Sequence, residues 1–302
     1  MNLLDAAKAG DLQTLQRLIR TGADLEGAGE NGATALILAA SNGHTPCLRA
    51  LIAAKADVDA SDNEDVTALI AAARDGYVDC ARYLLRADAD LEATDRNGCT
   101  ALVAAACKGC AKCLQLLINA GADIEAREEE RDSTMVMVTA GQGYADCLTL
   151  LLDAKADIET KNGYGDTALM LAADEGQTEC VKLLIDAKAE LETKDDNFFS
   201  TALVWATISG RAECVRALVD AKASLHAGDE FDNTPLFTAI YNGHTGCARV
   251  LVECKVDVNI ENSDGQTPLM CAAKAGNTEL MVYFLDRVIA IAKDDLWFTW
   301  FA

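Results

Sequence analysis

The sequence predicts an all-α protein that folds as a solenoid of stacked helix-turn-helix units. A pattern that reads Thr-Ala-Leu-Met-Leu-Ala-Ala at Thr167 recurs along the 302 residues at intervals of 33 or 34 positions. Its copies begin at Thr34, Thr67, Thr100, Thr134, Thr167, Thr201, Thr234 and Thr267. A glycine follows each copy, and proline occurs only three times in the chain. Such a period is typical of units that share one elongated core, so we expect a single domain over residues 1–302.

The first 26 residues are predicted to form an N-terminal capping half-repeat. Leu12, Leu15, Leu18 and Ile19 recur at helical spacing, and Gly22 stands where that helix is expected to end. The segment lacks the Thr that precedes the other copies and carries polar residues among its apolar ones. A terminal unit with one solvated face is what a stacked array requires.

Each later unit has three predicted parts, which the copy at Thr100 illustrates. A polar turn over 95–99 comes first, and the Thr100 hydroxyl then caps a short helix over 101–108. Gly109 reverses the chain. A second, amphipathic helix follows, as residues 179–185 show in another copy.

These features resemble the ankyrin repeat, whose motif runs from a turn through Thr-Pro-Leu-His-x-Ala-Ala, Gly-His and Val-Leu-Leu to Gly-Ala-Asp-Val-Asn. The resemblance covers about residues 2–290. It implies a β-turn and two antiparallel helices in each unit, stacked into a curved solenoid. The His of the motif is replaced throughout, which predicts apolar packing between units instead of a histidine hydrogen bond. The replacements are Ile37, Ile70, Val103, Met137, Met170, Val204, Phe237 and Met270.

A second departure concerns the glycine that precedes Ala-Asp in the motif. Lysine takes its place at Lys55, Lys155, Lys188, Lys222 and Lys255. If these residues are left-handed, each costs roughly 1–2 kcal/mol. Replacing Lys155 by Gly is therefore expected to raise stability.

The chain ends in an aromatic tail over residues 291–302, with Trp297, Phe298, Trp300 and Phe301. One interpretation of residues 294–302 is a cap that folds back over the last apolar face. The other is an exposed aromatic hook for a partner. We favour the cap.

The formal net charge of −22 bears on the kind of partner. It repels phosphate groups, so we expect no nucleic acid and no anionic membrane as ligand. A protein partner with a basic and apolar segment fits this charge. Most of the acids are otherwise expected to be solvated turn and hairpin residues of the repeats.

The sequence also indicates the cellular compartment in which the protein is expected. The first residues show no secretory signal, and no apolar run is long enough to span a membrane. With twelve cysteines, this predicts a soluble, monomeric protein in a reducing intracellular compartment, cytoplasmic or nuclear.

Three cysteines, Cys107, Cys110 and Cys113, form a double Cys-x-x-Cys and are candidate metal ligands. The repeat phase argues for another role. Cys113 shares its position with Cys47, Cys80, Cys147, Cys180, Cys214 and Cys247, which predicts a buried, apolar side chain. We therefore expect no metal and no cofactor.

Nothing in the sequence indicates catalysis. His44, His226 and His244 are the only histidines, and none pairs recognisably with a Ser or Cys nucleophile. The glycines follow the repeat period and form no phosphate loop. We expect a non-catalytic scaffold or adaptor. The alternative is a targeting or regulatory subunit, or a fragment of a larger enzyme whose catalytic domain lies outside this chain.

One modification site is suggested by the resemblance. Leu251 with residues 257–259 is similar to the pattern that asparaginyl hydroxylases modify in ankyrin repeats, and Asn259 would be the target. We prefer to interpret Asn259 as an ordinary hairpin residue.

The resemblance also implies that turn tips and first-helix ends line one concave groove that binds the partner. In the first half these positions are mixed polar and include Arg74, Asp75 and Arg96. In the second half they carry aromatic residues beside acids, as a protein-binding hot spot requires. These candidates are Tyr164, Asp174, Glu175, Phe198, Phe199, Trp205, Phe231 and Tyr241. An open alternative is that Phe199 turns inward to fill a distorted turn.

Overall fold

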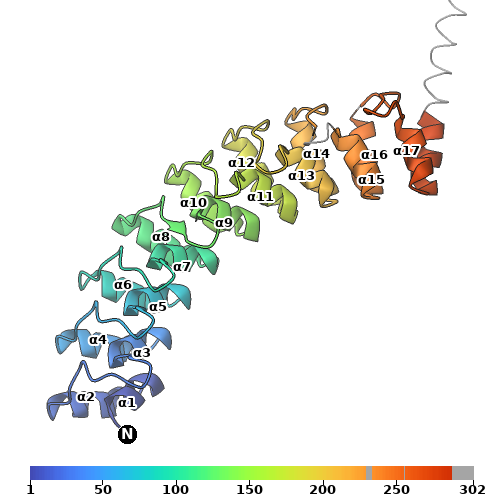
Figure 1. Cartoon of the computed structure of the whole chain (residues 1–302). Helices are drawn as coiled ribbons and strands as arrows, with labels where there is room; N and C mark the ends of the chain where they lie inside the picture. The colour runs from blue at the N-terminus through green and yellow to red at the C-terminus, as the bar shows by residue number, and fades with distance from the viewer. Residues whose placement is uncertain (229–232, 255, 288–302) are drawn as a thin grey trace, which may run out of the picture. The chain divides into compact units, whose positions relative to one another are not determined.

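The computed structural model describes residues 1–228, 233–254 and 256–287. Its helices come in pairs, one pair for each sequence repeat, and a polar turn joins consecutive pairs (Figure 1). The all-α solenoid prediction is therefore confirmed. The chain divides into two compact units, one formed by residues 1–139 and 144–157 and the other by residues 140–143 and the chain from 158 onward.

The first unit contains successive helix pairs. They are α1 (Leu3–Ala9) with α2 (Leu12–Arg20), α3 (Ala35–Ser41) with α4 (Thr45–Ala53), α5 (Ala68–Arg74) with α6 (Val78–Leu85), and α7 (Ala101–Cys107) with α8 (Ala111–Ala120). The first helices pack side by side in the order α1, α3, α5, α7, and the second helices do the same. Their apolar faces form one continuous core within this unit.

The unit ends in the connection after α8. Here β1 (Arg127–Glu128) pairs antiparallel with β2 (Ser133–Thr134), so that Arg127 lies opposite Thr134. Helix α9 (Met135–Gln142) passes from the first unit into the second after Thr139, and α10 (Ala145–Asp153) belongs to the first.

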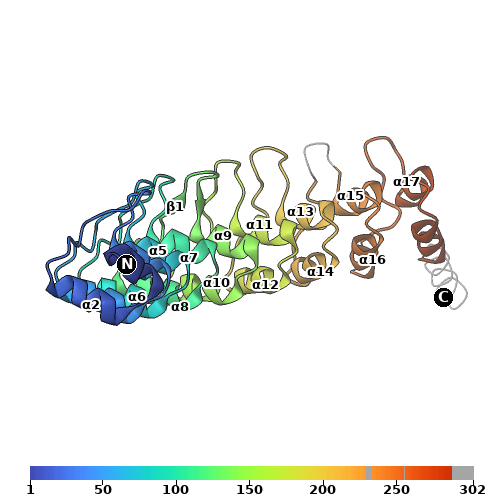
Figure 2. The same cartoon turned by 90° about the horizontal axis from the view of Figure 1, so that it is seen from below.

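The second unit repeats this arrangement. Its pairs are α11 (Ala168–Glu175) with α12 (Thr178–Asp186), α13 (Ala202–Ile208) with α14 (Ala212–Asp220), and α15 (Pro235–Tyr241) with α16 (Thr245–Glu253), followed by α17 (Pro268–Lys274) and a helical stretch over 278–287. Helices α11, α13, α15 and α17 pack in series, as do α12, α14 and α16. Within each unit the turns project to one side of the helices (Figure 2). The predicted tail over 291–302 lies outside the described residues.

The repeated Thr begins the first helix of most pairs as predicted. Its hydroxyl accepts the backbone N–H three residues on, at Thr34, Thr67, Thr100, Thr167, Thr201 and Thr267. Thr234 makes no such bond, and Pro235 occupies the first helical position after it. Thr134 belongs to β2. A side-chain cap satisfies a backbone donor that the helix itself leaves free.

The lysines that replace the motif glycine are left-handed, as the sequence prediction supposed. Their φ angles are 74° at Lys55, 64° at Lys155, 71° at Lys188 and 75° at Lys222. Lys255 lies outside the described residues. A residue with a Cβ is strained in this conformation, so these turns cost stability.

The core follows the apolar pattern of the sequence with one exception. Seven of the residues that replace the motif His are at most 4% exposed, which confirms apolar packing at Ile37, Ile70, Val103, Met137, Met170, Val204 and Phe237. The prediction is wrong at Met270, which is 58% exposed. Helix α17 is the last of the first helices that the structure describes, so no further described first helix covers its outer side. The periodic cysteines are buried as predicted.

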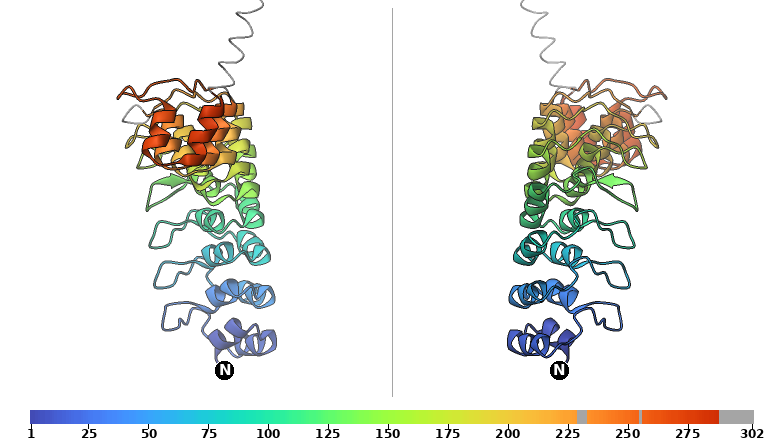
Figure 3. Two further views of the ribbon diagram at one scale, coloured as in Figure 1. Left: turned by 90° about the vertical axis from the view of Figure 1, so that its right-hand side faces the viewer. Right: turned by 90° about the vertical axis from the view of Figure 1, so that its left-hand side faces the viewer.

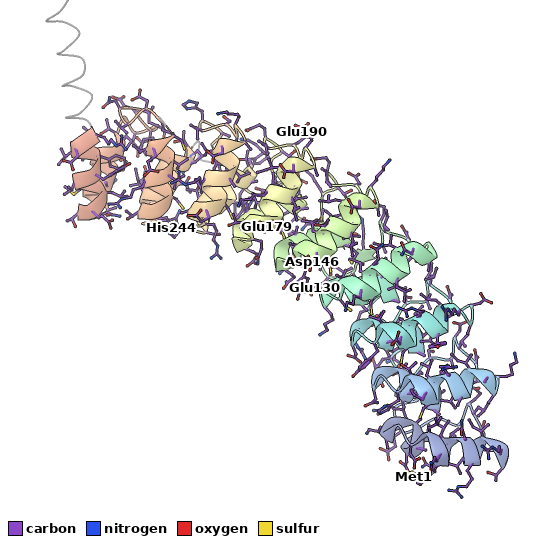
Figure 4. All side chains as sticks on the ribbon, turned by 180° about the vertical axis from the view of Figure 1, so that it is seen from behind. Met1, Glu130, Asp146, Glu179, Glu190 and His244 are labelled. Atoms are coloured by element: carbon purple, nitrogen blue, oxygen red, sulfur yellow. The ribbon has the colours of Figure 1, made fainter. Side chains whose placement is uncertain are left out.

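Many hairpin acids hold neighbouring repeats together, a role beyond the solvated one that the sequence suggested. The side chains of Glu26, Asp59, Glu92 and Glu125 in the first unit, and of Glu159 and Glu192 in the second, each accept a backbone N–H from the next repeat. Glu190, labelled in Figure 4, donates its N–H to Glu159 in this way at 2.9 Å. The hairpins of the first unit, which carry the first four of these bonds, lie beside its helices in Figure 3. Part of the acidic composition is therefore structural.

Candidate functional site

The candidate residues of the first unit are exposed and already paired. Arg74 closes α5, and its Nε lies 4.0 Å from the Asp75 carboxylate. Arg96, on the following turn, lies 3.5 Å from Glu64 and 3.7 Å from Asp65. Exposed pairs of this kind contribute little to stability, so their charges stay available to a partner.

The second unit carries exposed aromatic residues on two consecutive turns. Tyr164 is 51% exposed on one turn, and Phe198 and Phe199 are 48% and 56% exposed on the next. The alternative that Phe199 turns inward is therefore wrong. The two turns are joined, because the Asp196 N–H and the Asn197 side-chain amide both donate to the Tyr164 carbonyl. We call Tyr164, Phe198, Phe199 and Trp205 the aromatic patch.

Phe199 adopts a backbone conformation that disfavours a large side chain. Its φ is 51°, in the left-handed region, and it lies two residues before the helix-capping Thr201. Glycine holds the equivalent left-handed position at Gly32, Gly98, Gly165 and Gly265. A bulky residue at positive φ is strained, and strained residues cluster at functional sites, so Phe199 is a candidate functional residue.

One buried carboxylate holds the turn that carries Phe198 and Phe199, which we call the aromatic turn. Asp195 is only 2% exposed, and it accepts backbone N–H groups from Asn197 at 2.8 Å, Phe198 at 2.5 Å and Ser200 at 2.9 Å. The Trp205 indole Nε1 donates to the same carboxylate at 3.1 Å. A buried charge is tolerated when hydrogen bonds surround it, as here. The loop and the first helix of its repeat are thereby tied together.

Trp205 connects the patch to acidic side chains. Its ring meets that of Phe198 edge-on, with centroids 5.8 Å apart. It also lines a small hollow of about 30 Å³ with Asp166, Asp174 and two apolar side chains. Asp174 is held by the Ser209 hydroxyl, and its neighbour Glu175 is exposed at the end of α11. Aromatic surface and negative charge therefore lie side by side.

Tyr241 is placed differently from the aromatic patch. Its side chain is 47% exposed and stacks on Phe237, with ring centroids 6.3 Å apart. Its hydroxyl meets the Asn262 amide at 2.7 Å and the Cys271 thiol at 3.5 Å, both in the following repeat. Burial, followed by the bond to Cys271, raises the pKa of Tyr241. Phe231 lies outside the described residues.

Sequence reasoning missed Asp195, although a signal for it exists. An Asp or Asn starts the turn in several repeats and accepts two or more N–H groups of that turn. These residues are Asp62, Asp95, Asn162, Asp195 and Asn262. The spacing to the capping Thr is one residue longer at Asp195, which gives the aromatic turn its extra length.

The three clustered cysteines do not share one environment. Cys107 is exposed at the end of α7, Cys110 is half-buried at the N-cap of α8, and Cys113 is buried in the first turn of that helix. Burial, with a hydrogen bond to Cys110 as the next cause, raises the pKa of Cys113 to about 12. Among the described residues, no three His, Cys, Asp or Glu side chains are grouped to hold a metal ion.

The remaining sequence candidates lie in ordinary surroundings. Asn259 is exposed, and its N–H donates to Asp257 at 2.8 Å. His44 and His244 each bond a backbone carbonyl of the preceding repeat, at Lys8 and Ile208. Over the part of the chain that the structure describes, no helix has the length and apolar character to cross a bilayer.

Comparison with known families agrees with this architecture. A family model of ankyrin repeats in three copies matches residues 3–95, 135–229 and 221–295. A model of the single ankyrin repeat matches residues 97–129, between the first two of these matches. No curated protein matches the chain.

Proposed function

The chain belongs to the ankyrin-repeat family, whose repeats are in general protein-interaction modules, and we propose that it is a non-catalytic adaptor that binds a partner protein through the aromatic patch. Asp174 and Glu175 extend this surface with charge, and Tyr241 provides a further exposed aromatic ring apart from the patch. Arg74, Asp75 and Arg96 provide a second, polar contact region in the first unit.

The observation that carries the proposal is the exposure of Phe198 and Phe199 on a strained turn. Leaving two phenyl rings in water forgoes the free energy of their burial, and a left-handed Phe199 adds backbone strain. Exposed aromatic residues held in place by a scaffold are the usual anchors of protein interfaces. Here the Asp195 network supplies the rigid support.

The charge around the patch indicates the chemistry of the partner. Asp174 and Asp166 lie beside Trp205, and the whole chain carries a net charge of −22. A basic segment is attracted to such a surface, and apolar side chains on it would cover the aromatic rings. We propose that the partner presents a basic and apolar segment. Its binding should weaken as salt concentration rises.

The experiment compares partner capture by the intact chain with capture by a Tyr164→Ala, Phe198→Ala double variant. Proteins retained from a cell extract are identified by mass spectrometry, and the affinity of the main one is then measured by calorimetry. The double variant should lose at least tenfold in affinity while its circular dichroism spectrum is unchanged. Unchanged affinity would overturn the proposal.

A matched control tests whether the loss of affinity is specific to the aromatic patch. Val282 is 58% exposed in the same unit but lies outside the aromatic patch, so Val282→Ala removes exposed apolar surface elsewhere. This variant should bind as the intact chain does. An equal loss in both variants would indicate a general effect of apolar surface and contradict a defined site.

The twelve cysteines, all unpaired thiols, fit a reducing intracellular compartment, cytoplasmic or nuclear, and we include that location in the proposal. We further propose that the protein acts as a monomer. Light scattering coupled to size exclusion tests this, since a mass twice that of one chain would contradict it.

A further inference from the structure

The first turn of α8 brings two thiols together. Cys110 is the N-cap residue of this helix, and Cys113 is three residues further on. Side chains three residues apart in one helical turn are neighbours, with Cβ atoms about 5–6 Å apart. Cys110 makes no side-chain bond to a backbone N–H of the helix. The helix start therefore places the two thiols next to each other.

The pair is peculiar to this repeat. Six other second helices also carry a Cys at the position of Cys113, but their N-cap residues are His44, Tyr77, Tyr144, Gln177, Arg211 and His244. Several of these longer side chains reach back to the preceding repeat, as His44 does to the Lys8 carbonyl at 3.0 Å. The shorter Cys110 side chain lies over Gly76.

The two thiols differ in access, which separates their chemical roles. Cys110 is half-buried, so a small oxidant can reach its sulfur, whereas Cys113 is 0% exposed. Lys108 and Lys112 are exposed on either side of Cys110. Reactive cysteines characteristically occur at helix N-termini, beside basic residues and in Cys-x-x-Cys motifs, and Cys110 combines all three.

We propose that Cys110 and Cys113 form a redox-active dithiol that a peroxide converts to a disulfide across the first turn of α8. The Cys110 thiolate attacks one peroxide oxygen, the O–O bond breaks, and Cys110 becomes a sulfenic acid while hydroxide takes up a proton as water. The Cys113 sulfur then attacks the Cys110 sulfur. The S–O bond breaks, the proton of Cys113 goes to the leaving oxygen, and a second water is released. The two thiols supply the two electrons that reduce one peroxide.

Cys107 is the competing partner for Cys110. It is exposed at the end of α7, and Gly109 reverses the chain between the two. Burial raises the pKa of Cys99, on the turn before α7, to about 11, and Asp95 and Cys107 add to this rise. A disulfide that contains Cys107 would need the end of α7 to move, whereas the Cys110–Cys113 bond forms within one helical turn.

Trypsin can identify the pair directly. Cleavage after Lys108 and Lys112 places Cys107, Cys110 and Cys113 on three different peptides. The full chain is treated with hydrogen peroxide, free thiols are alkylated, and the peptides are analysed by mass spectrometry without reduction. The expected product is the peptide of residues 109–112 linked to that of residues 113–127, two hydrogen atoms lighter than the sum and separated by dithiothreitol. A link to the peptide that holds Cys107, or no link at all, would overturn the proposal.

Two variants test whether the helix geometry is responsible. Cys110→Ser should abolish the product, and Cys147→Ser, in the equivalent position of α10, should not. In the Cys110→Ser background, Tyr144→Cys then places a thiol at the N-cap of α10, three residues before Cys147. Asp146, labelled in Figure 4, lies between these positions in that first turn. This variant should regain peroxide-dependent disulfide formation with Cys147, and failure to do so in a folded chain would contradict the assigned geometry.

Discussion

The indole Nε1 of Trp205 donates a hydrogen bond to the buried carboxylate of Asp195 at 3.1 Å. The two residues are ten positions apart, one on the aromatic turn and the other in the middle of α13. The same carboxylate accepts the N–H groups of Asn197, Phe198 and Ser200. One side chain thus holds the backbone of the turn that carries the two phenyl rings.

Replacing Asp195 by Ala should lower the free energy of unfolding by about 2–3 kcal/mol, since buried N–H donors lose their acceptor. Asp195→Asn keeps one oxygen and should cost about half as much. Urea denaturation followed by circular dichroism measures both. Asp95→Ala is the matched control, because Asp95 is half-buried and accepts the N–H groups of a turn without a Trp partner. Equal losses at Asp95 and Asp195 would contradict the special role of the buried network.

Replacing Phe199 by Gly should raise the melting temperature and weaken partner capture together. Glycine relieves the left-handed strain at φ 51°, a gain of about 1 kcal/mol, while one anchor ring disappears. Calorimetric melting and the affinity for the partner are measured on the same preparation. Phe199→Asn serves as control, since Asn tolerates this conformation and also lacks the ring. A variant that gains stability with undiminished affinity would remove Phe199 from the binding surface.

Replacing Lys155 by Gly should raise the free energy of unfolding by about 1 kcal/mol, because its φ of 64° strains a residue with a Cβ. The neighbouring repeat offers the reverse experiment. Gly121 has φ 92° at the equivalent position, and a Cβ built there meets no atom within 4 Å. Gly121→Lys should therefore lower stability by a similar amount through backbone strain alone. Both changes are measured by urea denaturation, and effects of the same sign would contradict this interpretation.

Stability should fall as pH rises above about 9, the ordinary pKa of a thiol. Burial raises the pKa of Cys147, Cys180 and Cys247 to about 11 in the folded chain. The unfolded chain then loses these protons first, so folding is favoured below pH 9 and that contribution is lost between pH 9 and 11. Urea denaturation in a reducing buffer at pH 8, 9 and 10 measures the slope. In a Cys180→Ala variant the slope should be shallower, and an unchanged slope would exclude Cys180 as a contributor.

The repeat pattern alone determined the helix pairs, most of their capping Thr residues and the burial of the periodic Cys. These features depend on contacts within a few residues or on a period that every copy shares, so each copy confirms the others. Met270 departs from the pattern because burial also needs a neighbouring repeat on both sides.

Only the tertiary structure decided what the non-repeated residues do. The sequence placed Phe198 and Phe199 on a turn but left the direction of Phe199 open. The course of that turn depends on the Asp195 carboxylate, which accepts the Phe198 N–H, and on Trp205 in the following helix. Among the repeated positions, the structural role of Glu92 also depends on the tertiary structure, since its side chain accepts the N–H of Asp123, 31 residues away. Such contacts arise from the register of one repeat on the next, which a local pattern does not contain.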